Sequence, residues 1–78
     1  MTTITSACIR LDSTTLAAAT YDERRETLIL DFRDGTRYLY SGISPPLYRE
    51  LLGALSKGSF FNRHIRSHFP YVKIPPEN

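Results

Sequence analysis

The sequence contains no tryptophan, and it has only one cysteine, one methionine and two histidines among its 78 residues. A lone cysteine, Cys8, cannot form an internal disulfide, so the chain lacks the cross-links that hold together many small secreted domains. A closed zinc site takes four protein ligands, and one cysteine with two histidines supplies too few. We therefore expect neither a bound metal nor any other cofactor.

Long apolar stretches are also missing. No run of residues approaches the roughly 18 that a membrane-spanning helix requires. The first ten residues lack the basic segment and the apolar stretch of a secretory signal. These absences predict a cytoplasmic protein that makes no contact with a membrane.

The composition that remains is typical of a folded chain, with 41% hydrophobic and 23% charged residues. A chain of this length forms one domain, which buries only about two-thirds of the surface of its unfolded state. Deep enzyme-like pockets are scarce in such small domains. We therefore expect a protein that is not an enzyme, has no small-molecule substrate and recognises a partner through its surface.

The first half of the sequence predicts an antiparallel sheet. Leu28, Leu30 and Phe32 alternate with more polar residues, as they do in a strand with one buried face. Turn residues on both sides of this run mark the ends of neighbouring strands. The expected strands cover residues 14–21, 27–33 and 36–41.

The turn at Asp34-Gly35 admits two registers for the second and third strands. A two-residue loop places Tyr38 and Tyr40 on the face opposite Leu28 and Leu30. A three-residue loop with Gly35 in the left-handed conformation instead gathers all the large apolar side chains on one face. Because register follows burial, we favour the three-residue loop. The shared face then holds Leu28, Leu30, Phe32, Tyr38 and Tyr40.

Two helices are predicted after the strands. Ser44 followed by Pro45 is a strong start signal, because serine caps a helix and proline suits its first turn. We expect this helix to end at Gly58 in a left-handed cap, and Ser59 to cap a second helix that stops before Pro70. The predicted fold class is α+β, a three-stranded antiparallel meander with two short helices packed on one face.

The chain divides into three parts on this interpretation. Residues 1–10 are rich in threonine and serine and form a flexible or edge-pairing arm. Residues 11–74 form the single domain, in which Val72 and Ile74 belong to a last extended segment. Residues 75–78 form a C-terminal tail.

Several motifs extend over about residues 11–73: Tyr21-Asp22, Leu28-x-Leu30-x-Phe32, Gly35, Tyr38-x-Tyr40, Pro46 with Tyr48, Ser56-Lys57-Gly58-Ser59-Phe60-Phe61-Asn62, Ile65-Arg66 and Pro70-Tyr71. In these motifs the sequence resembles the KTSC family. The resemblance implies a small domain found at the C-terminus of some lysyl-tRNA synthetases and as standalone bacterial proteins, with no catalytic activity and with RNA as a suggested partner.

Positive charge gathers in the last thirty residues, which carry five cations and two acids. Such an asymmetry favours an anionic partner. We expect RNA phosphates to contact the cations and the backbone at the start of the second helix, where free N–H groups bind anions. Tyr71 is the candidate for stacking on a base. The predicted binding residues are Arg49, Lys57, Gly58, Ser59, Arg63, Arg66, Tyr71 and Lys73.

Each of these candidate binding residues also has a purely structural interpretation. Gly58 and Ser59 are also explained as helix caps, and Tyr71 as an anchor for the C-terminal segment. The rings of Tyr38 and Tyr40 are expected in the core rather than exposed for stacking. His64 and His68 lie one helical turn apart but lack further ligands, so we expect no metal there and a helix-capping role for His68.

A second function remains open, a protein–protein interaction adaptor. Ile29 and Leu39 pair across the outer face of the predicted sheet, and an unpaired edge strand is a further contact surface. We find no pair of carboxylates suited to acid–base work and no group that would orient a base beside Cys8, so no catalytic residue is predicted.

Overall fold

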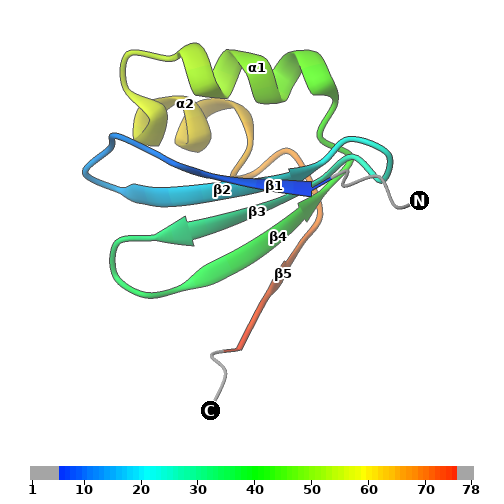
Figure 1. The fold of residues 1–78 in the computed structure, drawn as a ribbon, viewed down its shortest axis with the longest axis horizontal. Coiled ribbons are helices and arrows are strands. Elements are labelled where there is room, and N and C mark those ends of the chain that lie inside the picture. Colours follow the sequence, from blue (N-terminus) through cyan, green and yellow to red (C-terminus); the bar gives the residue numbers. More distant parts are fainter. Residues whose placement is uncertain (1–5, 76–78) are drawn as a thin grey trace.

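The computed structural model describes residues 6–75, which form one antiparallel sheet with two helices against one of its faces (Figure 1). The strands follow one another in the sheet in the order of the sequence, so every connection runs between neighbours. The elements are β1 (Ser6–Arg10), β2 (Leu16–Asp22), β3 (Thr27–Phe32), β4 (Arg37–Ser41), α1 (Pro45–Gly53), α2 (Lys57–His64) and β5 (Tyr71–Lys73).

The α+β class with an antiparallel meander and two helices on one face is confirmed, but the described part of the sheet has five strands where three were predicted. The fourth and fifth come from the segments before and after the domain's clear patterns. Residues 6–10 pair with β2 as an edge strand, and residues 71–73 pair with β4. Residues 1–5 of the predicted arm and residues 76–78 of the tail lie outside the described residues.

The β3–β4 hairpin has the predicted three-residue turn. Leu28 faces Tyr40 and Leu30 faces Tyr38 in the register. The Phe32 amide donates to the Thr36 carbonyl at 2.9 Å, and Gly35 adopts a φ of +95°, which residues with a Cβ seldom reach. The register therefore places the two tyrosines on the same face as the leucines.

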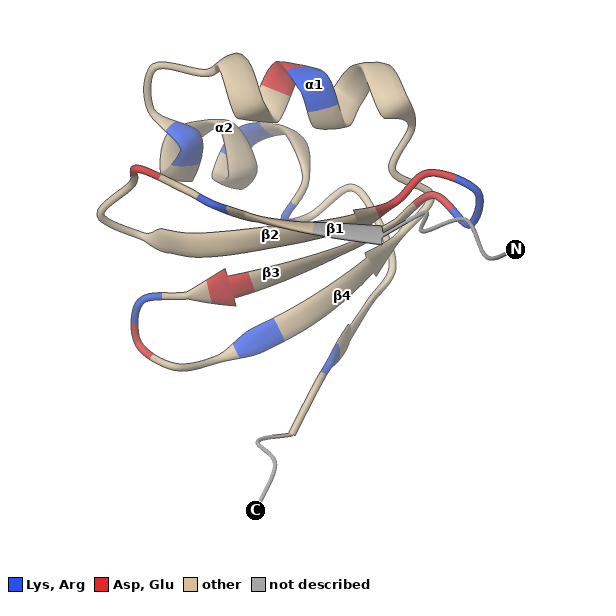
Figure 2. Ribbon diagram, viewed as in Figure 1, with Lys and Arg blue, Asp and Glu red and all other residues tan. Residues whose placement is uncertain are grey.

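This helix-facing side of the sheet forms the hydrophobic core. Leu28 and Leu30 of β3 and Leu16 of β2 are wholly inaccessible, and Leu51 of α1 and Ile65, just after α2, cover them. Burying one such side chain contributes about 1.5–3 kcal/mol. Within residues 8–75 no charged side chain is buried, and charged residues lie in turns, on both helices and on the strands β3, β4 and β5 (Figure 2).

The start of α1 agrees with the sequence, whereas the junction between the helices does not. Ser44 caps α1, its Oγ accepting the Leu47 amide at 3.3 Å. α1 ends at Gly53, and α2 begins at Lys57 with Ser56 as its cap, so the predicted caps at Gly58 and Ser59 are wrong. A helix that ends at Gly58 would include Leu55, but that side chain is fully exposed and belongs to the connection between the helices.

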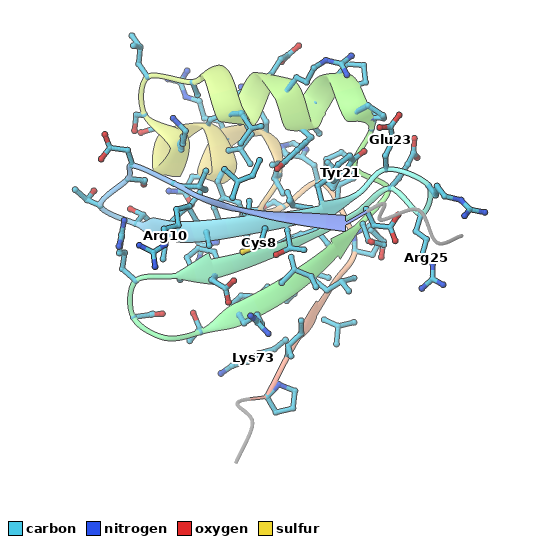
Figure 3. The ribbon with its side chains drawn as sticks, in the orientation of Figure 1. Cys8, Arg10, Tyr21, Glu23, Arg25 and Lys73 are labelled. Carbon is cyan, nitrogen blue, oxygen red and sulfur yellow. The ribbon has the colours of Figure 1, made fainter. Side chains whose placement is uncertain are left out.

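Two stacked tyrosines join β2 to α1. The ring centroids of Tyr21 and Tyr48 lie 4.2 Å apart at an interplanar angle of 18°, and Tyr21 extends from β2 toward α1 (Figure 3). The Tyr21 hydroxyl donates to the Ile43 carbonyl at 2.6 Å. The buried Tyr48 hydroxyl has no hydrogen-bond partner in the described part of the chain. Burial raises the pKa of both phenols, so both remain protonated at neutral pH.

We predict that replacing tyrosine by phenylalanine has opposite effects on the free energy of unfolding at positions 21 and 48. Tyr48→Phe removes a buried polar group that has no partner, and we expect the free energy of unfolding to rise by about 1 kcal/mol. Tyr21→Phe leaves the Ile43 carbonyl without its donor and is expected to cost about 1–2 kcal/mol. Chemical denaturation of both variants measures the difference. Equal destabilisation by the two substitutions would contradict this description of the core.

The raised pKa values also give a pH dependence. The folded state holds the Tyr48 proton more tightly than the unfolded chain does, so deprotonation of this phenol lowers the free energy of unfolding. At neutral pH the phenol is protonated in both states, and the full stability is present. It is lost as the pH rises above the ordinary tyrosine value of about 10. We expect Tyr48→Phe to lose less stability than the wild type between neutral and strongly alkaline pH.

Candidate functional site

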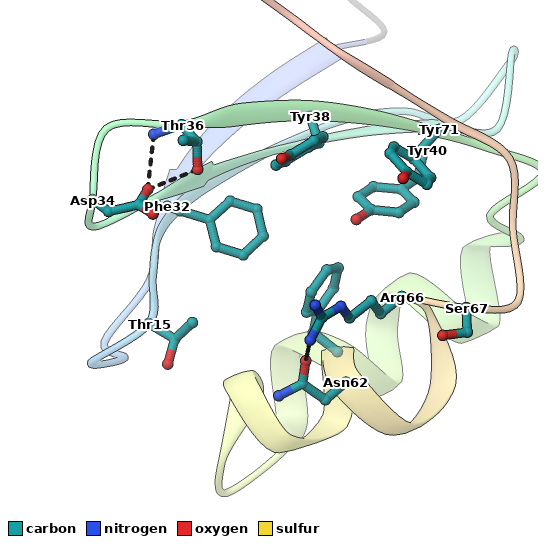
Figure 4. A pocket seen from close by; sticks show the side chains of 11 residues that line it. Thr15, Phe32, Asp34, Thr36, Tyr38, Tyr40, Asn62, Arg66, Ser67 and Tyr71 are labelled. Carbon is teal, nitrogen blue, oxygen red and sulfur yellow. Dashed lines mark hydrogen bonds between the residues drawn. The ribbon is translucent and has the colours of Figure 1, made fainter.

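A cleft of about 630 Å³ opens between the sheet and α2 (Figure 4). Its sheet wall consists of Phe32 from β3 and of Tyr38 and Tyr40 from β4, with Tyr71 of β5 beside them. The opposite wall comes from α2 and the turn after it, with Asn62 and Arg66 among its residues. Small-ligand sites commonly occupy 300–1,000 Å³, so the cleft is large enough to hold one.

The sheet wall is a continuous group of aromatic rings. The centroids of Tyr38 and Tyr40 lie 5.7 Å and 5.6 Å from that of Tyr71. Tyr40 is 3% exposed and belongs to the core, as predicted, whereas Tyr38 is only half-buried. Tyr71 is 58% exposed and is therefore the ring that a ligand reaches most easily.

Arg66 supplies the positive charge of the cleft. It lies two residues after the end of α2, and its Nη1 donates to the Asn62 Oδ1 at 3.4 Å. Within residues 6–75, no carboxylate lies within 4.0 Å of its guanidinium. Burial raises the pKa of Tyr40, and Arg66 opposes that rise, so the charge acts on the aromatic wall. The guanidinium is thus available to an anion inside the cleft (Figure 4).

A carboxylate lies at the turn end of the same cleft. Asp34 Oδ1 accepts the Thr36 amide at 2.9 Å and the Thr36 hydroxyl at 2.7 Å. These hydrogen bonds hold the pKa of Asp34 below its ordinary value, and Lys73 adds a smaller effect of the same sign. The carboxylate is therefore ionised at neutral pH. Sequence reasoning assigned Asp34 only to a turn, because nothing in its neighbours shows that α2 returns to face it.

The structure gathers some of the predicted binding residues and separates others. Arg66 and Tyr71 line the cleft, and Lys73 lies opposite Tyr38 in the register, on the same side of the sheet edge. Arg63 is exposed on α2, one turn before Arg66, whereas Arg49 is exposed on α1 and lines neither of the two hollows described here. Asn62 and Ser67 also line the cleft and were not predicted.

The start of α2 forms a second, smaller hollow that Lys57, Gly58 and Ser59 line together with Asp12. The Ser59 amide donates to the Ser56 Oγ at 3.3 Å, and the Lys57 ammonium donates to the Ala54 carbonyl at 3.2 Å. These groups are already engaged within the chain. The hollow therefore offers an anion fewer free groups than we expected at the start of the second helix.

Gly58 is buried because the helix packs closely against the loop before β2. A Cβ built on Gly58 would lie 2.9 Å from the Thr15 Oγ1 and 3.1 Å from the Thr15 Cβ. Contacts this short require a neighbour to move. The glycine is needed for this close approach rather than for a left-handed cap.

The histidines are accounted for by local contacts. The His68 Nε2 lies 2.9 Å from the Arg63 carbonyl, which matches the expected helix-capping role. The His64 ring packs at 4.5 Å from that of Phe60. Among the described residues no group of three potential metal ligands comes together, and no helix is long and apolar enough to cross a membrane.

The outer face of the sheet carries an apolar row. Ile29 pairs with Leu39 as predicted, and Leu39 in turn faces Val72 of β5, which is 64% exposed. Both described helices lie against the other face (Figure 1). In the part of the chain that the structure describes, Val72 is exposed, whereas Ile29 and Leu39 are half-buried.

Comparison with known proteins agrees with this fold. Residues 12–69 match the family model of the KTSC domain. A crystal structure of a KTSC domain protein from Yersinia pestis superimposes with a TM-score of 0.86 at 27% identity, covering 90% of this chain and 99% of that one.

Sequence relatives include a protein of Tsukamurella paurometabola, 34% identical over 64 residues that cover 82% of this chain and 96% of the relative. An uncharacterised protein of Stutzerimonas stutzeri is 31% identical over 85% of this chain and 94% of its own length. A lysine–tRNA ligase of Nostoc punctiforme is 32% identical over 54 residues, which cover 69% of this chain but only 10% of the ligase.

The contact between Gly58 and Thr15 predicts the effect of adding a methyl group. We expect Gly58→Ala to lower the free energy of unfolding by about 1–3 kcal/mol, because the new Cβ overlaps the Thr15 side chain. Thr15→Ala should restore part of this loss in the double variant. Gly53→Ala in α1 is the matched control, since nothing lies within 4 Å of its Cβ. If Gly58→Ala were as stable as Gly53→Ala in chemical denaturation, the close approach would be disproved.

Proposed function

The chain belongs to the KTSC domain family, and we propose that it is a small non-enzymatic module that binds single-stranded RNA. In this proposal, the phosphates contact the basic region formed by α2 and the segment after it. A lysine–tRNA ligase carries a segment similar to this chain. The tRNA in the name of that enzyme supports RNA as the ligand in our proposal. The cleft supplies the contacts.

The observation that carries the proposal is the position of Arg66. Its guanidinium lies across the cleft from tyrosine rings, and no described carboxylate neutralises it. Single-stranded nucleic acids are bound by this combination, in which cations hold the backbone and aromatic rings receive the bases. A paired base is stacked on both faces and would have no free face to offer Tyr71, so the cleft favours an unpaired strand.

Two further cations extend the positive charge of the cleft. Arg63 is exposed near the end of α2, three residues before Arg66, outside the residues that line the cleft. Lys73 lies at the other wall, beside Tyr71. Three phosphate contacts are therefore proposed near the cleft, while Arg49 and the start of α2 stay predictions for a longer strand.

The alternative is a protein–protein interaction adaptor, which the apolar row of Ile29, Leu39 and Val72 favours. That row lies on the face of the sheet away from the cleft. A substitution in the row therefore separates the two functions, because it leaves the cleft residues in place.

RNA binding should depend on salt and on Arg66. With three phosphates neutralised on a single strand, the logarithm of the binding constant should fall with the logarithm of salt concentration with a slope of about −2. We expect Arg66→Ala to weaken binding roughly tenfold and to make the slope shallower, because one charged contact is lost. Fluorescence anisotropy of a labelled single-stranded RNA at several salt concentrations measures both quantities.

Arg24→Ala is the matched control. Arg24 is exposed in the turn between β2 and β3, so its removal changes the net charge equally without touching the cleft. An equal loss of binding in both variants would show that RNA binding depends only on the net charge of the protein and not on the cleft. Binding that is absent, or indifferent to salt, would remove the proposal.

A further inference from the structure

The cleft carries a charged side chain toward each end, and the two charges have opposite sign. Asp34 lies beside Thr36 at the turn end, and Arg66 acts on Tyr40 at the other end. Thr36 and Tyr40 are four residues apart, which is about 13 Å along a strand. A ligand that is negative at one end and donates hydrogen bonds at the other would therefore bind in a single direction (Figure 4).

The aromatic surface, which lies toward the Arg66 end because Tyr71 faces Tyr40 in the register, selects a flat ring. Tyr71 is the most exposed ring of the wall, and the half-buried Tyr38 stands edge-on to it at 74°. A planar group laid on the exposed face of Tyr71 therefore meets the edge of Tyr38 as well. Stacking of a base on an aromatic side chain contributes about 1–3 kcal/mol.

The carboxylate retains capacity to accept another hydrogen bond. An ionised carboxyl group offers about four acceptor positions, and Thr36 uses two of them at Asp34. The same carboxylate repels phosphate, which places the phosphate at Arg66 instead. The hydroxyl that distinguishes RNA from DNA is a hydrogen-bond donor, and a carboxylate is a suitable acceptor for it.

We propose that the cleft is a subsite for two adjacent unpaired ribonucleotides of the bound strand. The base of one stacks on Tyr71 and its phosphate contacts Arg66, whereas the ribose 2′-hydroxyl of the other donates to Asp34, because a single nucleotide is too short to span both ends of the cleft. This assignment rests on the proposed function, and it adds the orientation of the two nucleotides and a residue that selects RNA over DNA.

The test compares a short single-stranded RNA rich in adenine with the DNA strand of the same sequence. The full chain should bind the RNA about tenfold more tightly, since a hydrogen bond to a charged group is worth at least about 1.5 kcal/mol. Asp34→Asn keeps an oxygen to accept from Thr36 but loses the charge. We expect it to reduce the preference for RNA to about twofold, partly because DNA binds better once the repulsion is gone.

The stacking arm uses the same RNA with one adenine replaced by 2-aminopurine, whose fluorescence changes when it stacks on an aromatic ring. Tyr71→Phe should retain the fluorescence change and the affinity, whereas Tyr71→Leu should lose the change and bind about tenfold more weakly. Val72→Thr is the control, because Val72 faces the other side of the sheet. Adenosine monophosphate alone is expected to bind far more weakly than the strand.

The outcomes separate this subsite from RNA binding itself. Equal affinity for RNA and DNA in the wild type, or an unchanged preference in Asp34→Asn, would overturn the subsite even while Arg66→Ala still weakens RNA binding. Adenosine monophosphate binding as tightly as the strand would also overturn it, because the ligand would then be a free nucleotide. If no single strand binds at all, the proposed function fails and the subsite fails with it.

Discussion

The three-residue turn between β3 and β4 determines which residues this protein can present to a ligand. Gly35 adopts a φ of +95°, and the Phe32 amide reaches the Thr36 carbonyl across the turn. A turn one residue shorter would move Tyr38 and Tyr40 to the outer face of the sheet, because side chains alternate along a strand. The core would then lose Tyr40, and the cleft would lose its aromatic wall. Fold and candidate site therefore depend on the same turn.

The second requirement is the close packing of α2 against the chain before β2. Gly58 lets the helix approach Thr15, and this position brings Phe61 and Ile65 into the core. Arg66 follows immediately after Ile65, so the burial of Ile65 also positions the cation beside the cleft. Within the segment from Gly58 to Arg66, the first residue therefore serves stability and the last serves binding.

Much of this arrangement could be predicted from local patterns. The register of β3 and β4, the Ser44 cap and the burial of Tyr40 each depend on a few neighbouring residues, and the structure confirms them. For residues 6–10 the sequence leaves open a flexible or an edge-pairing arm, and for residues 71–73 it predicts only an extended segment, because an edge strand is defined by its partner rather than by its own alternation; the structure shows both paired.

The second helix shows the limit of such patterns most clearly. Glycine and serine at positions 58 and 59 fit two descriptions equally well, a pair of caps or a tight contact inside the helix. Only the position of Thr15, more than forty residues earlier in the sequence, decides between them. For the same reason the sequence indicated Arg66 and Tyr71 but gave no sign that Asp34 and Asn62 would join them.

The protein has two distinct faces that could meet a partner. The helix side holds a cleft with rings, a cation and an ionised carboxylate, whereas the outer side holds the apolar row of Ile29, Leu39 and Val72. The cleft has the chemistry of a strand-binding site, because it combines charge with surfaces on which a base can stack. This difference makes the location of binding the decisive question.

The most direct test is a titration of the ¹⁵N-labelled protein with single-stranded RNA, followed by the amide chemical shifts. We predict that the changes concentrate at Tyr38, Asn62, Arg66 and Tyr71, around the cleft. Changes confined to Ile29, Leu39 and Val72, or no changes at all, would contradict the account.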